Sequence, residues 1–182
     1  SAGIRLMLVA LAFVYGCELP GRSSDSGQER LWPQAAIVAE LTDLTTTQAA
    51  EATLADIKAT GFDTVLLDAR GTPRDLFRHW LDTAKSLQLR TVAWIGSHGT
   101  GGLASANGRP VAADEYAQLA DGLVVTVELP GDLAFARDLR TTLRETGSDT
   151  LLIAGVTAQA ASDGPGPATR LPAGVFDAIL LE

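Results

Sequence analysis

The sequence is poor in the residues that build disulfides, metal centres and nucleic-acid interfaces. It contains one cysteine and two histidines, so no disulfide can form within the chain, and we expect no metal site. Lys and Arg number 14 against 22 Asp and Glu, which gives a formal net charge of −8. Binding to a phosphate backbone needs clusters of Lys and Arg, so we expect no nucleic-acid partner. There is no Walker A motif, and the glycine-rich residues 99–102 do not lead into a helical pattern, so no cofactor is expected.

The single cysteine, Cys17, ends an apolar run that follows Arg5. Residues 6–17 read LMLVALAFVYGC, too short for a helix across a bilayer, which takes about 20 apolar residues. A basic flank, a short apolar run and a small residue are typical of a secretory signal peptide. The Gly16-Cys17 end resembles the lipobox of bacterial lipoproteins, in which the cysteine is lipidated. The resemblance implies a signal peptide over residues 1–17, lipidation of Cys17, and export to the bacterial cell envelope with a lipid anchor in the membrane.

Two other interpretations of this run stay open: an ordinary signal peptide or membrane anchor, and a first helix of the core. Residues 18–34 are rich in Gly, Ser, Pro and charge without periodicity, which indicates a flexible linker. Residues 35–182 have the length of one domain.

This domain alternates apolar strands with amphipathic helices. The predicted strands are 35–41, 62–68, 90–95, 122–128, 150–156 and 176–182, and the predicted helices are 45–60, 73–87, 112–120 and 132–145. Near-continuous apolar strands between helices indicate a parallel sheet that is covered on both faces. We predict an α/β fold of parallel βα repeats, a (β/α)8 (TIM) barrel cut after its sixth strand. The alternative is a doubly wound, flavodoxin-like sheet.

Acidic residues stand at the carboxyl ends of several predicted strands. These acidic residues are Glu40, Asp68, Glu128 and Glu182. Arg70, Trp94 and His98 also lie at or just after the ends of predicted strands. In parallel α/β folds the carboxyl ends of the strands form the ligand-binding face. We therefore predict that these side chains share one end of the sheet.

Residues 61–95 (GFDTVLLDARGTPRDLFRHWLDTAKSLQLRTVAWI) resemble the second and third βα units of (β/α)8-barrel glycoside hydrolases. In many of those families the general acid is a glutamate that ends strand four, which implies Glu128 here, although Val127 stands where an Asn is frequent. Glycoside hydrolysis takes two carboxyl groups, and Asp68 or Glu182 would supply the second. We expect the apolar Leu129 and Pro130 to desolvate Glu128, as a general acid requires.

The resemblance implies further roles at the same end of the sheet. Trp94 would stack on a sugar ring, with packing inside the barrel as the alternative. His98, Arg70 and Glu40 would bind substrate. The implied protein acts on, or binds, extracellular or cell-envelope polysaccharide or oligosaccharide. A non-catalytic carbohydrate-binding or scaffold lipoprotein and a doubly wound small-molecule-binding domain are the alternatives.

Overall fold

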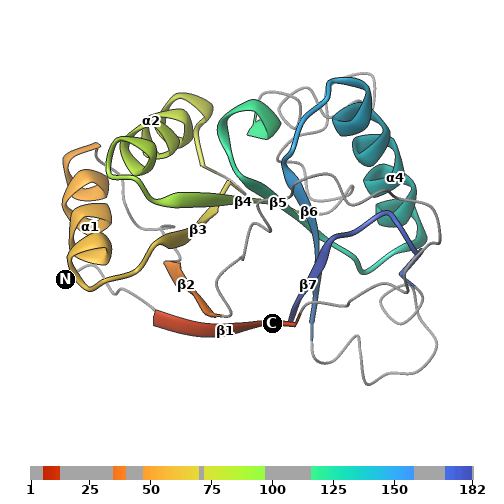
Figure 1. The fold of residues 1–182 in the computed structure, drawn as a ribbon, viewed down its shortest axis with the longest axis horizontal. Helices are drawn as coiled ribbons and strands as arrows, with labels where there is room; N and C mark the ends of the chain where they lie inside the picture. The colour runs from red at the N-terminus through yellow and green to blue at the C-terminus, as the bar shows by residue number, and fades with distance from the viewer. Residues whose placement is uncertain are drawn as a thin grey trace, which may run out of the picture.

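A computed structural model describes residues 6–12, 35–39, 47–69, 72–96, 116–157 and 171–181, with side chains described for 48–69, 72–96, 116–157 and 171–180. Seven strands close a barrel in sequential order, and the helices lie outside it (Figure 1). The strands are β1 Leu6–Ala12, β2 Ala35–Ala39, β3 Thr64–Asp68, β4 Arg90–Gly96, β5 Gly122–Thr126, β6 Leu151–Val156 and β7 Ala178–Leu181. The helices are α1 Thr47–Ala59, α2 Arg74–Ser86 and α4 Pro130–Glu145, and residues 116–119 form one further helical turn.

The strand order separates the two folds that the sequence leaves open. Strands β2 to β7 pair in parallel, each with the next along the chain. A doubly wound sheet needs a point where the strand order reverses. The order contains no such reversal, so the flavodoxin-like alternative is wrong. The predicted α/β fold with parallel βα repeats is confirmed, and its strand order is that of a barrel.

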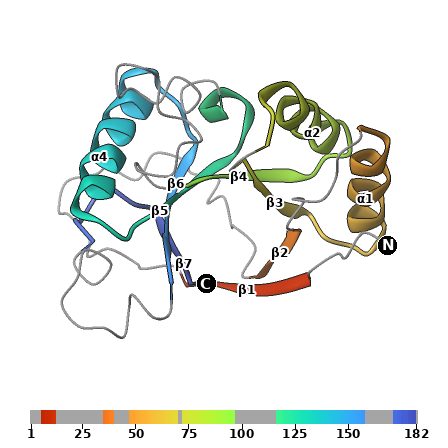
Figure 2. The ribbon, with the colours of Figure 1, turned by 180° about the vertical axis from the view of Figure 1, so that it is seen from behind.

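Strand β1 comes from the apolar run that the sequence assigns to a signal peptide. It lies between β2 and β7 and is antiparallel to both, with Leu6 opposite Ala39 and Leu11 opposite Leu180 (Figures 1 and 2). A short apolar run fits a strand of a barrel as well as the hydrophobic segment of a signal peptide, because both need only a few consecutive apolar residues. The alternative of a first helix is wrong for residues 6–12. Cys17 and the linker 18–34 lie outside the described residues.

Side chains alternate between two apolar layers. One layer fills the barrel interior and contains Leu66, Val92, Trp94, Val124, Ile153, Ala178 and Leu180. The other lies between barrel and helices, where Val65, Ala93 and Leu123 meet Leu54, Phe77 and Leu139. Successive residues of a strand point to opposite faces, so a strand covered on both faces must be apolar throughout. All five residues of β3 and of β5 are accordingly buried.

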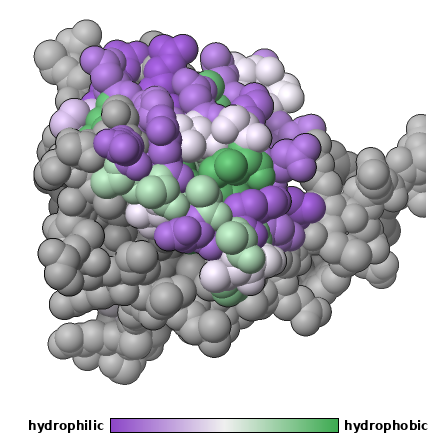
Figure 3. Space-filling model, turned by 90° about the vertical axis from the view of Figure 1, so that its left-hand side faces the viewer, coloured by the Kyte–Doolittle hydropathy of each residue, from purple (hydrophilic) through white to green (hydrophobic). Residues whose placement is uncertain are grey.

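The outer faces of the helices are polar. On the face that contains α1, the described residues are mostly hydrophilic, with small hydrophobic areas between the polar side chains (Figure 3). On that surface His79 Nε2 of α2 lies 3.1 Å from Glu51 Oε1 of α1. This pattern is typical of amphipathic helices that pack on a barrel with one face.

Aspartates that precede two of the strands hold neighbouring strands together at the amino end of the barrel. Asp121 donates its N–H to the Thr91 carbonyl (2.8 Å), and its Oδ2 accepts the Thr91 N–H (2.9 Å). Asp177 repeats both bonds with Leu152, each at 2.8 Å. Asp177 also binds the Arg140 guanidinium of α4. The Asp at these joins therefore has a structural role, which the sequence analysis did not assign.

The element boundaries differ from the predicted ones by a few residues. Helix α4 begins at Pro130 rather than residue 132, since proline suits the first turn of a helix, where its missing N–H costs nothing. Strand β5 ends at Thr126, two residues before its predicted end. Of the predicted helix 112–120, residues 116–119 are helical, and 112–115 lie outside the described residues.

Candidate functional site

The structure places three of the predicted site residues at one end of the barrel. Asp68 ends β3, Trp94 lies opposite Asp68 near the end of β4, and Glu128 follows β5 by two residues. Because β3, β4 and β5 are parallel neighbours, their carboxyl ends lie side by side. We call this end of the three strands, with Asp68, Trp94, Thr126 and Glu128, the barrel mouth. Glu40, Arg70, His98 and Glu182 lie outside the described residues.

Asp68 is a buried carboxylate at the barrel mouth. It is 4% exposed, and its position in β3 is two residues after Leu66, which belongs to the interior layer. Its carbonyl accepts the Thr72 hydroxyl (3.1 Å), and the next N–H, of Ala69, donates to the Trp94 carbonyl (2.9 Å). These bonds fix the turn after β3 against β4. A buried carboxylate costs free energy that an apolar residue would not, so packing alone does not account for Asp68.

Trp94 forms part of the inner wall of the mouth. It is 8% exposed and packs in the interior layer. Its Nε1 donates a hydrogen bond to Thr126 Oγ1 at 2.9 Å, between two buried side chains. Packing inside the barrel, the alternative that the sequence left open, fits this burial, and stacking on a sugar stays a prediction. Thr126 was not predicted as a site residue, although its position two residues before Glu128, at the end of an apolar run, indicates the same end of the sheet.

Glu128 is exposed to solvent, which contradicts its expected desolvation. Leu129, which was expected to cover it, is itself 60% exposed. The backbone here is fixed by Asp132, whose Oδ2 accepts the N–H groups of Glu128 (3.0 Å) and Leu129 (2.8 Å). Asp132 is 1% exposed and stands in the first turn of α4, where a negative charge is stabilised by the helix dipole. Asp132 therefore holds the loop that presents Glu128.

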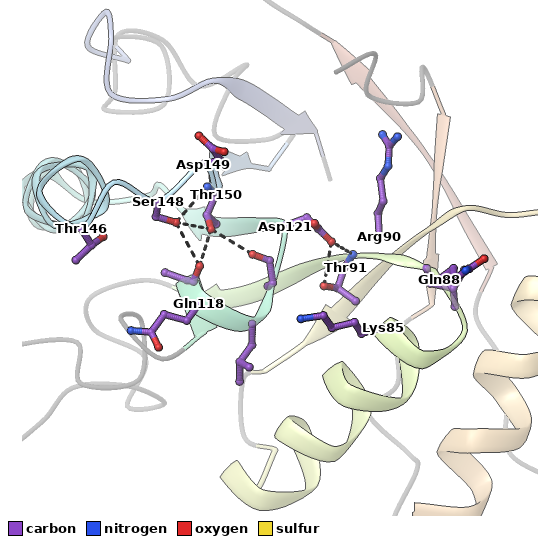
Figure 4. Close-up of a pocket in the computed structure, with 14 residues that line it drawn as sticks. Lys85, Gln88, Arg90, Thr91, Gln118, Asp121, Thr146, Ser148, Asp149 and Thr150 are labelled. Atoms are coloured by element: carbon purple, nitrogen blue, oxygen red, sulfur yellow. Dashed lines mark hydrogen bonds between the residues drawn. The ribbon is translucent and has the colours of Figure 1, made fainter. Parts of the chain in front are cut away.

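A polar groove with a volume of about 700 Å³ lies at the opposite end of the barrel. It runs along the amino ends of β4, β5 and β6, beside the last turns of α2 and α4 (Figure 4). Its polar lining comprises Lys85, Gln88, Arg90, Thr91, Gln118, Asp121, Thr146, Ser148, Asp149 and Thr150. Among the predicted site residues that the structure describes, Asp68, Trp94 and Glu128 do not line this groove.

The described residues contain no group of three or more His, Cys, Asp or Glu side chains placed to hold a metal ion. No helix within the described ranges is long and apolar enough to cross a membrane.

No protein-family model matches the chain, and no curated protein matches it in sequence. Solved structures are similar to it at low level. The 3-dehydroquinate dehydratase from Aquifex aeolicus VF5 matches with a TM-score of 0.45 and 22% identity, over 60% of this chain and 49% of that one. The chitinase from Chromobacterium violaceum ATCC 12472 matches with a TM-score of 0.45 and 17% identity, over 72% and 48%. The maltogenic α-amylase AmyB from Thermotoga neapolitana matches with a TM-score of 0.40 and 13% identity, over 60% and 41%.

The chain thus spans less than half the length of each of these structures. The barrel fold follows from the order of its strands, β1 to β7 in sequence.

Proposed function

We propose that the barrel mouth binds polysaccharide and that the protein is glycoside-hydrolase-like, with Glu128 and Asp68 as its carboxyl pair. The observation that carries the proposal is the placement of these two groups at the same end of the barrel, Asp68 as the last residue of β3 and Glu128 two residues after β5. Glycoside hydrolysis needs one carboxyl group that donates a proton and one that stays ionised. Asp68 is 4% exposed, whereas Glu128 is open to solvent, so one carboxyl group lies inside the mouth and the other lies at its edge.

The roles follow from position. Glu128 stands at the solvent edge on a loop held by Asp132, where it can reach the glycosidic oxygen of a bound chain and act as general acid. Asp68 lies deeper, on the interior side of β3, and is the second carboxyl group of the pair. In the sequence, Glu40, Arg70, His98 and Glu182 follow β2, β3, β4 and β7, and we propose that they complete the rim and that Glu182 is the alternative second carboxylate.

The exposure of Glu128 also supports a second candidate, a non-catalytic carbohydrate-binding protein. An exposed carboxylate can accept hydrogen bonds from the hydroxyl groups of a sugar without taking part in a reaction. The two candidates share the binding site and differ only in turnover.

Replacement of Glu128 by glutamine separates the two candidates. The Glu128 side chain is exposed, so the variant should fold like the wild type. If Glu128 is the general acid, we expect the release of reducing sugar from envelope and extracellular polysaccharides to fall by roughly 10²-fold or more, the usual contribution of a positioned proton donor. Glu145→Gln, at the exposed end of α4, is the matched control and should leave the rate unchanged.

Three outcomes decide between the candidates. A large loss of turnover in Glu128→Gln alone supports the glycosidase. Binding of polysaccharide without turnover, equal in wild type and variant, supports the carbohydrate-binding protein. A wild-type chain that neither binds nor cleaves any of the polysaccharides rules out both.

We also propose that Cys17 is lipidated and anchors the protein in the bacterial envelope. In a bacterial host, Cys17→Ser should lose palmitate labelling and membrane fractionation, whereas Ser23→Ala in the linker should keep both. Intact mass gives a second measurement, because a mature chain that starts at Cys17 lacks residues 6–12 and therefore strand β1. Unchanged labelling in Cys17→Ser, or a mature chain that retains residues 6–12, would contradict the proposal.

A further inference from the structure

The polar groove at the amino end of the barrel is a second place where a ligand can bind. Its volume of about 700 Å³ falls within the range of small-ligand sites, roughly 300–1,000 Å³. It lies at the amino ends of the strands, whereas the barrel mouth lies at their carboxyl ends. A ligand in the groove therefore occupies a site separate from that of the carboxyl pair.

The floor of the groove is held by its own hydrogen bonds. The Thr150 hydroxyl donates to the carbonyls of Ala117 (2.6 Å) and Ala120 (3.2 Å), and Ser148 Oγ donates to Thr150 Oγ1 (2.8 Å). On the other side, Asp121 Oδ2 accepts the Thr91 N–H at 2.9 Å (Figure 4). Thr150 and Thr91 are both buried. Because these side chains are already ordered, little conformational entropy of the protein is lost when a ligand binds.

The walls carry side chains that can still form hydrogen bonds. Lys85 extends from the last turn of α2 toward the segment that contains Gln118 (Figure 4). Among the described residues the Lys85 ammonium has no hydrogen bond or ion pair. Gln88 and Gln118 also line the groove and are exposed, and an amide side chain both donates and accepts hydrogen bonds.

The charges of the lining indicate the class of ligand. Lys85 and Arg90 are cationic, and Asp121 and Asp149 are anionic, so the lining has no net charge. A phosphate or another anion would meet the two carboxylates, and a cation would meet Lys85 and Arg90. An uncharged ligand with many hydroxyl groups avoids both repulsions, and its hydroxyl groups can form hydrogen bonds with the Lys85 ammonium and the Gln118 amide.

We propose that the groove is a second carbohydrate-binding site that holds a neutral oligosaccharide segment away from the barrel mouth. This inference depends on the proposed function in one respect, namely that the ligand is a glycan. Two separate sites on one chain raise the affinity for a long polymer that reaches both, because the second binding event becomes intramolecular.

Chemical-shift mapping tests the groove and the mouth independently. The full-length ¹⁵N-labelled chain is titrated in turn with maltohexaose, chitohexaose and cellohexaose at millimolar concentration. We expect at least one probe to shift the amide signals of Gln118, Ser148 and Asp149.

In Lys85→Ala and Gln118→Ala, both at exposed positions, these shifts should need about fivefold more ligand, since each variant loses one hydrogen bond. Arg137→Ala, on the exposed face of α4 and outside the groove lining, is the matched control and should leave them unchanged.

Each outcome supports or overturns the second site. Shifts at the groove that need more ligand in Lys85→Ala and Gln118→Ala support the second site. If the residues of the barrel mouth do not shift in the same titration, the proposed function is contradicted but the second site is not. Shifts confined to Asp68, Trp94 and Glu128 overturn the second site and leave the mouth intact. No shift at the groove with any probe, or groove shifts that both variants leave unchanged, also overturns it.

Discussion

Replacing Phe77 by alanine should lower the free energy of unfolding by about 4 kcal/mol, within the range of roughly 3–5 kcal/mol for deletion of a buried aromatic ring. The Phe77 side chain is 0% exposed and lies in the layer between helices and barrel. Its ring makes edge contacts with two others, Trp80 in its own helix at 6.0 Å between centroids and Tyr116 at 4.9 Å. Phe77 thus connects α2 with the helical turn before β5, and alanine would leave a cavity next to both.

Urea denaturation followed by tryptophan fluorescence measures this loss. The matched control is Asp82→Ala, on the exposed face of the same helix, where a change within about 0.5 kcal/mol is expected for a surface substitution. A loss below about 1 kcal/mol for Phe77→Ala, no larger than a typical surface effect, would show that α2 does not pack on the barrel as described.

Replacing Asp132 by alanine should lower the free energy of unfolding by about 3 kcal/mol, because hydrogen bonds to a charged group are each worth roughly 1.5–3 kcal/mol. The Asp132 carboxylate accepts two backbone N–H groups, at 3.0 Å from Glu128 and 2.8 Å from Leu129, and is 1% exposed. Alanine leaves both donors without this acceptor and removes a negative charge from the first turn of α4.

Asp138→Ala is the control for this change, since Asp138 lies on the exposed face of the same helix. Its loss of stability should stay within about 0.5 kcal/mol. The amide signal of Glu128 should shift in Asp132→Ala and stay in place in Asp138→Ala. Equal stabilities of the two variants would rule out the role of Asp132 in holding the loop.

The sequence predicted the domain's βα repeats well because both faces of each strand are covered. A strand such as β3, with all its residues buried, leaves a continuous apolar run that is visible without any tertiary information. The polarity of the strands followed as well, and with it the common end of Asp68, Trp94 and Glu128. When strands are parallel, their carboxyl ends all lie at the same end of the sheet, so residues at those ends must lie there too.

The local sequence pattern did not predict the solvent exposure or the hydrogen bonds of those residues. Glu128 was expected to be desolvated by its apolar neighbours, but whether Leu129 covers a carboxylate depends on where the chain turns after β5. The buried Asp132 sets that turn. Likewise, the hydrogen bond from Trp94 to Thr126 joins residues on different strands, and no pattern in the sequence predicts it.

The sequence by itself determined the class of the fold, the direction of the strands and the end of the barrel at which Asp68 and Glu128 lie. These properties follow from hydrophobic periodicity and short connections, which are local. The tertiary structure decided between barrel and doubly wound sheet, gave residues 6–12 a strand that is antiparallel to its neighbours, and formed the polar groove. Each of these depends on which distant segments come to lie side by side, and that is fixed only when the whole chain packs.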